Sequence, residues 1–235
     1  MIDLHSHIIP NVDDGSKNSD ESIEILNEAK KVGFSDVILT SHFIPEYNET
    51  NIEELINLKD DLQEKCDSIK LHSGMEVYIT ERMEELLNNK KILTLAGSNY
   101  LLMELPLSNH VNYFEYVIYV LQSKNIIPII AHPERYMEVQ KNYKRVEEYV
   151  EKGCLIQCNY ASILGYYGKD AQKTVKKLLR EKLVNFLGSD CHRKESIYLN
   201  IPKAVKKIVK IIGEEEFYKI STINPQKILN NEEIL

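Results

Sequence analysis

The 235-residue sequence contains no apolar run that approaches the roughly 20 residues needed to span a bilayer. Its start is acidic and shows no signal-peptide pattern. We therefore expect a cytoplasmic protein with no membrane insertion. The net charge is -7, with 29 Lys and Arg against 36 Asp and Glu. Because nucleic-acid binding requires a basic face, we expect no nucleic acid among the main partners.

The sequence also lacks internal repeats, low-complexity segments and linkers rich in Pro, Gly or Ser. With 43% hydrophobic residues it can bury a sizeable core, and we expect a single domain over residues 1–235. Short apolar runs alternate with helical patterns, which predicts strand–helix units and a parallel sheet. The predicted strands are residues 1–7, 36–42, 70–79, 100–105, 126–131, 154–158 and 184–188.

Helical periodicity fills the segments between these strands. Asn18 followed by Glu21 has the pattern of a helix N-terminal cap, and this helix is predicted to run to about residue 32, before Gly33. Pro225 suits the first position of a last helical turn. The other predicted helices are residues 52–62, 81–88, 111–123, 144–151, 169–182, 201–211 and 214–220.

The most informative stretch is the first predicted strand, which ends in His5 and His7. Residues i and i+2 of a strand point to the same side, so the two imidazoles project together. Imidazole is a good ligand for Zn, Mn and Fe. A lone His-x-His pair is a weak signal, but later apolar runs end in the same kind of residue.

Six of the seven predicted strands end in, or carry near their end, a His, Asp or Glu. In a closed parallel barrel the C-terminal ends of all strands lie at one rim, where barrel enzymes have their active sites. Glu76 and Glu104 lie in apolar runs, where a buried carboxylate needs a partner or a metal. Asp14 also suits a helix cap. The candidate metal ligands are His5, His7, Asp14, His42, Glu76, Glu104, His132, Asp190 and His192.

Nine donors exceed the three or four protein ligands of a typical zinc site and suit two or three ions that share a bridging carboxylate. A mixed set of His and carboxylate without thiolate suits Mn, Fe, Zn or Mg. Three divalent ions would outweigh the charge of the four candidate carboxylates, so the loaded site would attract a phosphate dianion. Metal-bound water can then serve as the nucleophile. Arg135, close after His132, can clamp a phosphate in a two-pronged contact.

These residues resemble, in chain order, the motifs of the PHP (polymerase and histidinol phosphatase) superfamily. The motifs are His5-Ser6-His7, Asp13-Asp14-Gly15, Thr40-Ser41-His42, Gly74-Met75-Glu76, Met103-Glu104, Ala131-His132-Pro133-Glu134-Arg135 and Ser189-Asp190-Cys191-His192. The Asp-Leu-His-Ser-His-Ile start, the Val-Asp-Asp-Gly loop and the Glu-Arg-Tyr after His132 are most similar to the bacterial capsule-type tyrosine phosphatases (CpsB/YwqE-like).

The resemblance implies a distorted seven-stranded (β/α)7 barrel of the α/β class, with three divalent metal ions that are often manganese. The implied ligand groups are His5, His7, Glu76 and Asp190 for one ion, Glu104 and His132 with bridging Glu76 for a second, and Asp14, His42 and His192 for the third. Arg135 matches a substrate-binding arginine and, with Asp190 and His192, belongs to the implied catalytic residues. A second substrate arginine lies several residues after the last Asp-x-His in the family, and only Arg193 is available here, close to the motif.

The implied activity is hydrolysis of phosphotyrosine on the C-terminal tail of a partner bacterial tyrosine kinase, with effects on capsule or exopolysaccharide synthesis. An alternative is a small-molecule phosphatase of the same superfamily, such as histidinol phosphatase, which would share the metal cluster and differ in pocket shape. A third hypothesis is an inert regulatory barrel. That reading predicts lost ligands, whereas all nine candidates are present.

The four cysteines show no paired zinc-finger spacing and no Cys-x-x-Cys. None has an arginine six positions on, so the Cys-x5-Arg pattern of cysteine-dependent phosphatases is absent. We interpret Cys191 as a packed neighbour of the ligands. Asp13 is interpreted as a loop residue behind the ligands, Asn159 as a pocket residue, and His72 and His110 as structural or surface residues.

Overall fold

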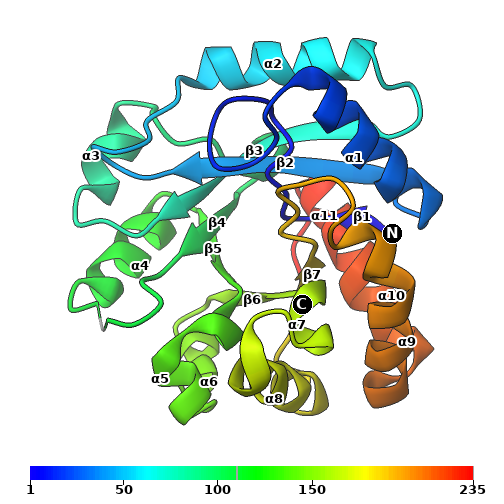
Figure 1. The fold of residues 1–235 in the computed structure, drawn as a ribbon. Helices are drawn as coiled ribbons and strands as arrows, with labels where there is room; N and C mark the ends of the chain where they lie inside the picture. Colours follow the sequence, from blue (N-terminus) through cyan, green and yellow to red (C-terminus); the bar gives the residue numbers. More distant parts are fainter. Residues whose placement is uncertain (110, 235) are drawn as a thin grey trace.

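Seven parallel strands form one sheet in the order of the sequence in this computed structural model, which describes residues 1–109 and 111–234 (Figure 1). The strands are β1 Ile2–Asp3, β2 Asp36–Phe43, β3 Lys70–Tyr78, β4 Tyr100–Glu104, β5 Ile127–Ala131, β6 Leu155–Asn159 and β7 Phe186–Gly188. Each strand pairs with the next one along the chain. The predicted seven-stranded α/β fold is confirmed.

The sheet closes on itself only at one end, between β1 and β7. Ser6 and Cys191 form an isolated parallel bridge there. The backbone N–H of His7 donates to the carbonyl of Cys191 at 2.9 Å, and that of Asp190 donates to the carbonyl of His5 at 2.8 Å. The predicted distorted barrel is therefore confirmed, and it is closed at the rim that carries the candidate ligands.

Helices surround the sheet on its outer side (Figure 1). The α-helices are α1 Ser19–Lys31, α2 Ile52–Glu64, α3 Met83–Asn88, α4 Phe114–Ser123, α5 Met137–Lys141, α6 Arg145–Glu151, α7 Tyr160–Leu164, α8 Gly168–Arg180, α9 Ile201–Ile212, α10 Glu214–Tyr218 and α11 Asn224–Leu229. Shorter or irregular turns are η1 Leu95–Gly97, η2 Pro133–Arg135, η3 Tyr198–Asn200 and η4 Lys219–Ile223. The predicted cap of α1 is present, since the side-chain oxygen of Asn18 accepts from the N–H of Glu21 at 2.9 Å.

Several predicted boundaries are wrong in an instructive way. The first strand was predicted to run to His7, but β1 ends at Asp3. Beyond it the ladder is irregular, since the N–H of Ser6 donates to the hydroxyl of Thr40 at 3.0 Å. The helix predicted from residue 111 begins at Phe114. Helices α5 and α7 were not predicted, since five residues are too few to show a period of 3.6.

The apolar interior has two layers. The larger cluster packs the outer face of the sheet against the helices. A smaller cluster fills the barrel itself: Leu4, Ile38, Leu95, Tyr100, Leu102, Ile129, Ala131, Phe186 and Ile228. Helix α11 covers the end opposite the closed rim, where Asn224 donates to the carbonyl of Asn185 just before β7 at 2.9 Å. Polar ligands at one end and apolar filling below them leave a single rim for chemistry.

In residues 1–109 and 111–234 no helix has both the length and the apolar character that crossing a bilayer requires.

Candidate metal centre

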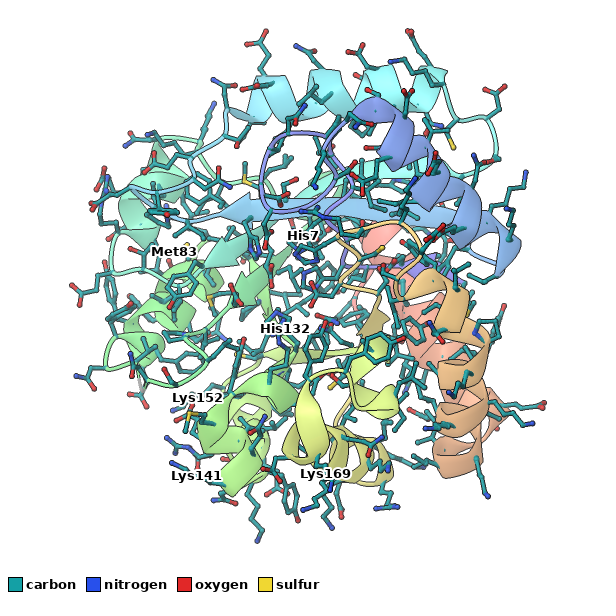
Figure 2. All side chains as sticks on the ribbon, in the orientation of Figure 1. His7, Met83, His132, Lys141, Lys152 and Lys169 are labelled. Atoms are coloured by element: carbon teal, nitrogen blue, oxygen red, sulfur yellow. The ribbon has the colours of Figure 1, made fainter. Side chains whose placement is uncertain are left out.

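The nine predicted ligands all lie at the closed rim of the barrel. Figure 2 shows His7 and His132 pointing into the centre of the molecule, although 125 positions separate them in the sequence. His42, Glu76 and Glu104 belong to the ends of β2, β3 and β4, while His132 directly follows β5. The remaining ligands come from the segments after β1 and β7: His5, His7, Asp14, Asp190 and His192.

One group of donors surrounds the facing rings of His5 and His7. Their Nε2 atoms lie 3.0 Å apart, and both residues are fully buried. The Oε2 atom of Glu76 lies 3.3 Å from Nε2 of His5 and 3.5 Å from Nε2 of His7. The Oδ1 atom of Asp190 lies 3.6 Å and 3.5 Å from the same two nitrogens. Four donors therefore converge on one small volume.

Glu76 connects this group to a second one. Its other oxygen, Oε1, lies 2.9 Å from Nε2 of His132, which in turn lies 3.7 Å from Oε1 of Glu104. His42 Nδ1 lies 2.9 Å from Oε2 of Glu76, in an orientation that makes no hydrogen bond. A carboxylate that offers one oxygen to each side is the arrangement expected of a bridging ligand.

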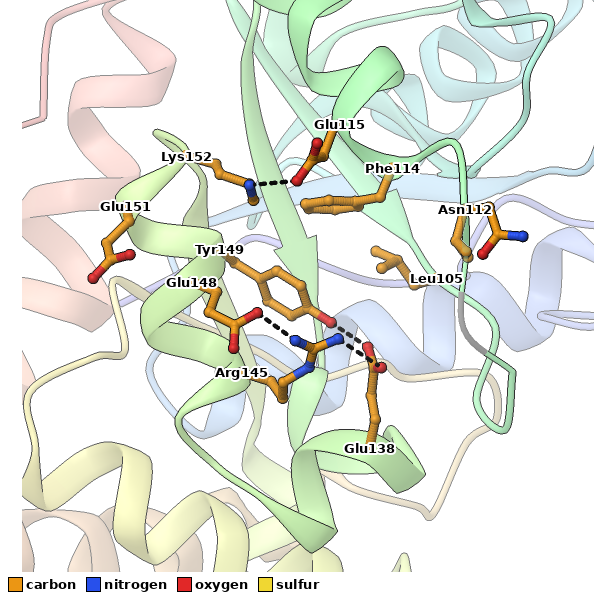
Figure 3. Close-up of a pocket in the computed structure, with 11 residues that line it drawn as sticks. Leu105, Asn112, Phe114, Glu115, Glu138, Arg145, Glu148, Tyr149, Glu151 and Lys152 are labelled. Carbon is orange, nitrogen blue, oxygen red and sulfur yellow. Dashed lines mark hydrogen bonds and ion pairs between the residues drawn. The ribbon is translucent and has the colours of Figure 1, made fainter.

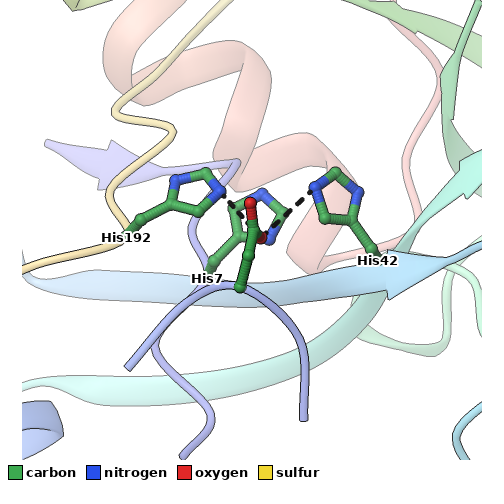
Figure 4. A group of neighbouring side chains, drawn as sticks. His7, His42 and His192 are labelled. Atoms are coloured by element: carbon green, nitrogen blue, oxygen red, sulfur yellow. Dashed lines mark ion pairs between the residues drawn. The ribbon is translucent and has the colours of Figure 1, made fainter. Parts of the chain in front are cut away.

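The third group lies nearer to the surface (Figure 4). Oδ1 of Asp14 is 3.2 Å from Nε2 of His192 and 3.7 Å from Nε2 of His42. The ring of His7 stacks on that of His192, with centroids 4.1 Å apart, and is tilted against that of His42, with centroids 4.4 Å apart. The Asp14 side chain is 70% exposed. This group is therefore the part of the centre that an incoming molecule reaches first.

Three of these histidines are oriented by a partner on the ring nitrogen that faces away from the cluster. Nδ1 of His5 bonds to Oε1 of Gln157 at 3.0 Å, Nδ1 of His7 to Oδ2 of Asp13 at 2.8 Å, and Nδ1 of His192 to the carbonyl of Asp190 at 2.9 Å. An oxygen acceptor fixes the proton on Nδ1 and leaves the Nε2 lone pair pointing inward. That tautomer is the one in which imidazole binds a metal ion.

The donor set fits divalent cations. With both Nδ1 atoms protonated, the Nε2 lone pairs of His5 and His7 face each other at 3.0 Å, which is repulsive unless a proton or a cation lies between them. Oε2 of Glu76 is buried and makes no hydrogen bond. A buried carboxylate oxygen without a partner is costly. A mixed set of imidazole and carboxylate suits Mn, Fe or Zn.

The pKa values of the metal-free centre point in the same direction. Burial lowers the pKa of His5, but the charges of Glu76 and Asp190 outweigh it and raise the pKa to about 8. Burial raises the pKa of Glu104, and the nearby charge of Glu76 raises it further. The centre thus takes up protons when no cation is present, because its negative charges are close together and shielded from water.

The backbone at the rim is strained at two of the ligands. His132 and Asp190 adopt positive φ values of 32° and 54°, which non-glycine residues rarely adopt. Such strain persists where the surrounding structure imposes it, and it concentrates at functional sites. The rim is also closely packed at Gly188. A Cβ at this position would lie 2.7 Å from Cβ of His5 and from Nε2 of Gln157, so no larger residue fits there without a shift of these side chains.

Asp190 joins the cluster to the adjacent cavity. Its Oδ1 faces the histidines, while its Oδ2 accepts from Nδ2 of Asn159 at 2.7 Å, the hydroxyl of Tyr167 at 3.0 Å and the guanidinium of Arg135 at 3.0 Å. Arg135 also lies over the ring of Tyr167 at 4.4 Å. A cavity of about 190 Å³ opens here, lined by Asp14, His42, Glu76, Glu104, His132, Arg135, Tyr167, Asp190 and His192.

The other sequence-based interpretations have mixed outcomes. Asp13 lies behind the ligands and orients His7, as expected. His72 pairs with Asp36 at 2.9 Å near the opposite ends of the strands, which agrees with a structural role. Burial raises the pKa of the Cys191 thiol to about 12, so this thiol is a packed and protonated neighbour. His110 lies outside the described residues.

Arg193 is bound to the backbone beside the cavity and does not line it. Its guanidinium donates to the backbone carbonyls of Gly15 and of His192, and Arg193 is not among the residues that line the opening. Its predicted role in substrate binding stays a prediction. The observed contacts connect the Asp14 loop to the segment of His192.

Sequence reasoning missed Gln157 and Tyr167. Gln157 is a fully buried polar residue on β6, two positions before Asn159 and therefore on the same face of the strand. That alternation of polar residues in an otherwise apolar strand was a usable signal. Tyr167 follows α7 in a short connection and carries no comparable signal, since nothing in the local sequence tells where its ring points.

Comparisons with known proteins agree with this geometry. A family model described as capsular polysaccharide synthesis, CpsB/CapC, matches residues 1–230. The tyrosine-protein phosphatase YwqE of Bacillus subtilis (strain 168) is 32% identical over 238 residues, covering 100% of this chain and 93% of its own length. The tyrosine-protein phosphatase CpsB of Streptococcus pneumoniae is 32% identical over 238 residues, covering 97% of this chain and 98% of its own.

Solved structures show the same relationship. A crystal structure from the work on YwqE of Bacillus subtilis and CpsB of Streptococcus pneumoniae, described as unique metal-dependent tyrosine phosphatases, has a TM-score of 0.93 at 31% identity. The match covers 100% of this chain and 96% of that one. The histidinol phosphate phosphatase of Lactococcus lactis has a TM-score of 0.58 at 17% identity, covering 89% of this chain and 92% of its own, which is a likeness of fold alone.

Proposed function

The chain belongs to the CpsB/CapC family of capsular polysaccharide synthesis proteins, and we propose that it is a metal-dependent protein-tyrosine phosphatase. The observation that carries this proposal is the convergence of nine His and carboxylate side chains at the barrel rim, seven of which line one opening together with Arg135. The alternative, a small-molecule enzyme such as histidinol phosphatase, has only a likeness of fold in its favour.

We propose that the centre holds three divalent ions, with manganese as the first choice. Several ions are supported by overlapping groups of donors, each close enough together to hold a metal: His5, His7 and Asp190; His5, Glu76 and His132; His42, Glu76 and Glu104; and His7, Asp14, His42 and His192. Glu76 appears in two groups and would bridge neighbouring ions. When bound, such ions neutralise phosphoryl oxygens and activate water as a nucleophile.

The residues of the chain provide the orientation. Arg135 is held by Asp190 and Tyr167 with its guanidinium at the opening, where it would bind two phosphoryl oxygens at once. Asp190 is assigned two tasks, to hold an ion through Oδ1 and to fix Arg135 through Oδ2. His192, with its proton held on Nδ1, would present Nε2 to the ion nearest the surface.

The proposed substrate is the phosphotyrosine tail of a bacterial tyrosine kinase that acts in capsule or exopolysaccharide synthesis, and the proposed site of action is the cytoplasm. Family membership supports this choice of partner. Cys154 and Cys191 are not expected to act as nucleophiles, since burial raises the pKa of each thiol to about 12 and keeps both protonated.

The test combines elemental analysis with activity on one sample of the full chain. We expect manganese in stoichiometric excess over protein and faster hydrolysis of a phosphotyrosine peptide than of histidinol phosphate. Chelator should abolish the activity and added Mn²⁺ should restore it, whereas a thiol-alkylating reagent should leave it intact. Faster turnover of histidinol phosphate would favour the alternative enzyme, and no release of phosphate from any aryl phosphate by the Mn-loaded protein would sink the proposal.

A further inference from the structure

A second cavity, larger than the metal pocket, lies between α4 and α6 (Figure 3). Its volume is about 550 Å³. Its apolar walls come from Leu105, Val111, Phe114 and Tyr149, each less than a tenth exposed. The two aromatic rings pack against each other with centroids 5.1 Å apart. The depth of the cavity is therefore apolar and partly aromatic.

Two cations and four carboxylates form the edge of this cavity, and both cations are paired with carboxylates. Lys152 binds Glu115 at 2.7 Å, and Arg145 binds both Glu138, at 3.6 Å, and Glu148 (Figure 3). Four carboxylates against two cations leave this edge negatively charged, so it disfavours an acidic group of a ligand. The apolar depth remains available for an uncharged side chain.

Two short segments connect this cavity to the metal pocket. In the first, Glu104 lines the metal pocket and the next residue, Leu105, lines the cavity. In the second, Arg135 lines the metal pocket and Glu138, three positions later, lines the cavity. The two openings are thus lined by neighbouring residues of the same two segments.

Leu107 and Met137 lie on the same two segments, two residues after Leu105 and one residue before Glu138, and we call them the lip. Their side chains are exposed, 42% and 46% respectively, although both are large and apolar. The N–H of Met137 donates to the carbonyl of Leu107 at 2.8 Å, and the N–H of Leu105 donates to the hydroxyl of Tyr136 at 3.0 Å. These bonds tie the two segments together, so the exposed apolar pair is preformed.

We propose that the lip and the cavity between α4 and α6 dock a bulky apolar residue that flanks the phosphotyrosine of a protein substrate. This inference rests on the proposed function, and it adds that the substrate carries a bulky apolar residue next to its phosphotyrosine. A small phosphate ester fits within the 190 Å³ of the metal pocket and does not reach the lip. A peptide whose phosphate lies beside Arg135 passes over the lip, and its neighbouring side chain meets the apolar walls. Burial of that side chain supplies affinity.

The test compares two substrates with the same enzyme. One is p-nitrophenyl phosphate, which occupies the metal pocket alone. The other is a phosphotyrosine peptide with Phe or Leu within three residues of the phosphotyrosine. In the double variant Leu107→Ala and Met137→Ala, we expect kcat/KM for the peptide to fall about tenfold, mainly through KM. Hydrolysis of p-nitrophenyl phosphate should stay within about twofold.

The matched control is Val150→Ala, which removes a 40% exposed apolar side chain from α6 without touching the cavity. It should leave both substrates unaffected. A second peptide, with Gly in place of the flanking Phe or Leu, should lose about tenfold against the wild type and almost nothing against the lip variant. That loss of additivity would identify the lip as the binding partner of the flanking residue.

The outcomes separate this inference from the function on which it rests. If the wild type hydrolyses the phosphopeptide and the lip variant does so equally well, docking at the lip is wrong and the phosphatase proposal stands. An equal loss on both substrates assigns the lip a structural role and also overturns docking. If the wild type hydrolyses p-nitrophenyl phosphate but no phosphopeptide, the protein-phosphatase proposal fails and the docking inference fails with it.

Discussion

The metal centre and the cavity between α4 and α6 are both lined by carboxylates and nitrogen groups, yet these groups are arranged in opposite ways. In the cavity each cation faces a carboxylate, as Lys152 faces Glu115. In the metal centre nitrogen faces nitrogen, as His5 faces His7 at 3.0 Å, and Oε2 of Glu76 has no hydrogen-bond partner. Charged groups that pair with one another need no further ligand. Buried metal-binding atoms whose lone pairs face one another without hydrogen bonds require a cation.

Removal of a ligand is expected to have the largest effect. In Asp190→Ala the first donor group loses an oxygen and Arg135 loses its partner. We expect metal content to fall and kcat to drop by more than the roughly 100-fold that loss of an outer partner costs. Elemental analysis and phosphate release measure the two effects. The control is Asp36→Ala, at the other end of the strands, which should retain metal and activity. Near-full activity of Asp190→Ala would show that Asp190 is not a metal ligand.

A smaller effect is expected where the ligand stays and only its orientation is lost. Gln157→Leu removes the acceptor of the His5 ring, so the Nε2 lone pair is no longer fixed toward the cluster. Metal affinity should weaken about 10- to 100-fold, with activity recovered at high Mn²⁺. Metal titration followed by activity measures this. Gln122→Leu, which changes an exposed glutamine on α4, should titrate like the wild type, and identical curves for both variants would mean that Gln157 plays no orienting role.

Protons should compete with the cation, which predicts opposite pH dependence for the two forms of the protein. In the metal-free form the folded-state pKa of His5 is about 8, above its ordinary value of 6.5. Its protonation therefore contributes stability that is complete below pH 6.5 and is lost as pH rises through 8, on the order of 2 kcal/mol. The metal-loaded form should instead become more stable over this range, because deprotonated imidazole binds the ion.

Denaturant unfolding at a series of pH values, with and without Mn²⁺, measures both trends. A matched sample in chelator controls for residual metal. If both forms changed in the same direction between pH 6.5 and 8, competition between proton and cation at His5 would be excluded.

The smallest effect is expected from the paired edge of the cavity. Glu115→Gln breaks the contact with Lys152, but both side chains are exposed to water and salt screens such pairs. We expect unchanged metal content, unchanged hydrolysis of p-nitrophenyl phosphate and no measurable shift of the melting temperature. Differential scanning calorimetry checks the last point. A clear loss of metal from the Glu115→Gln variant would mean that the ion pairs of the cavity edge and the metal centre are not independent.

Much of the fold was predictable because local patterns carry it. Alternating apolar and amphipathic runs indicated seven strand–helix units, and all seven strands are present in sequence order. The errors fall where local patterns are weak, in the early end of β1 and in the five-residue helices α5 and α7. There the backbone is held by side chains distant in sequence, such as Thr40 for Ser6.

The sequence by itself determined which side chains meet. Parallel strands deliver the residues at their C-terminal ends to one rim, so His and carboxylate residues at or just after six of the seven ends suffice to bring nine donors together. This prediction uses only the hydrophobic periodicity and the strand topology, and it does not depend on the rotamer of any side chain.

Only the tertiary structure decided how those side chains face one another. Bridging by Glu76, the anchoring of His5 on Gln157 and the turn of Arg193 toward the carbonyl of Gly15 depend on rotamers set by residues from distant segments. The lip of Leu107 and Met137 is a further case, since an exposed apolar residue becomes informative only when the fold puts a second one beside it, on segments that also line a cavity. Direction and proximity across segments are properties of packing, which no local pattern encodes.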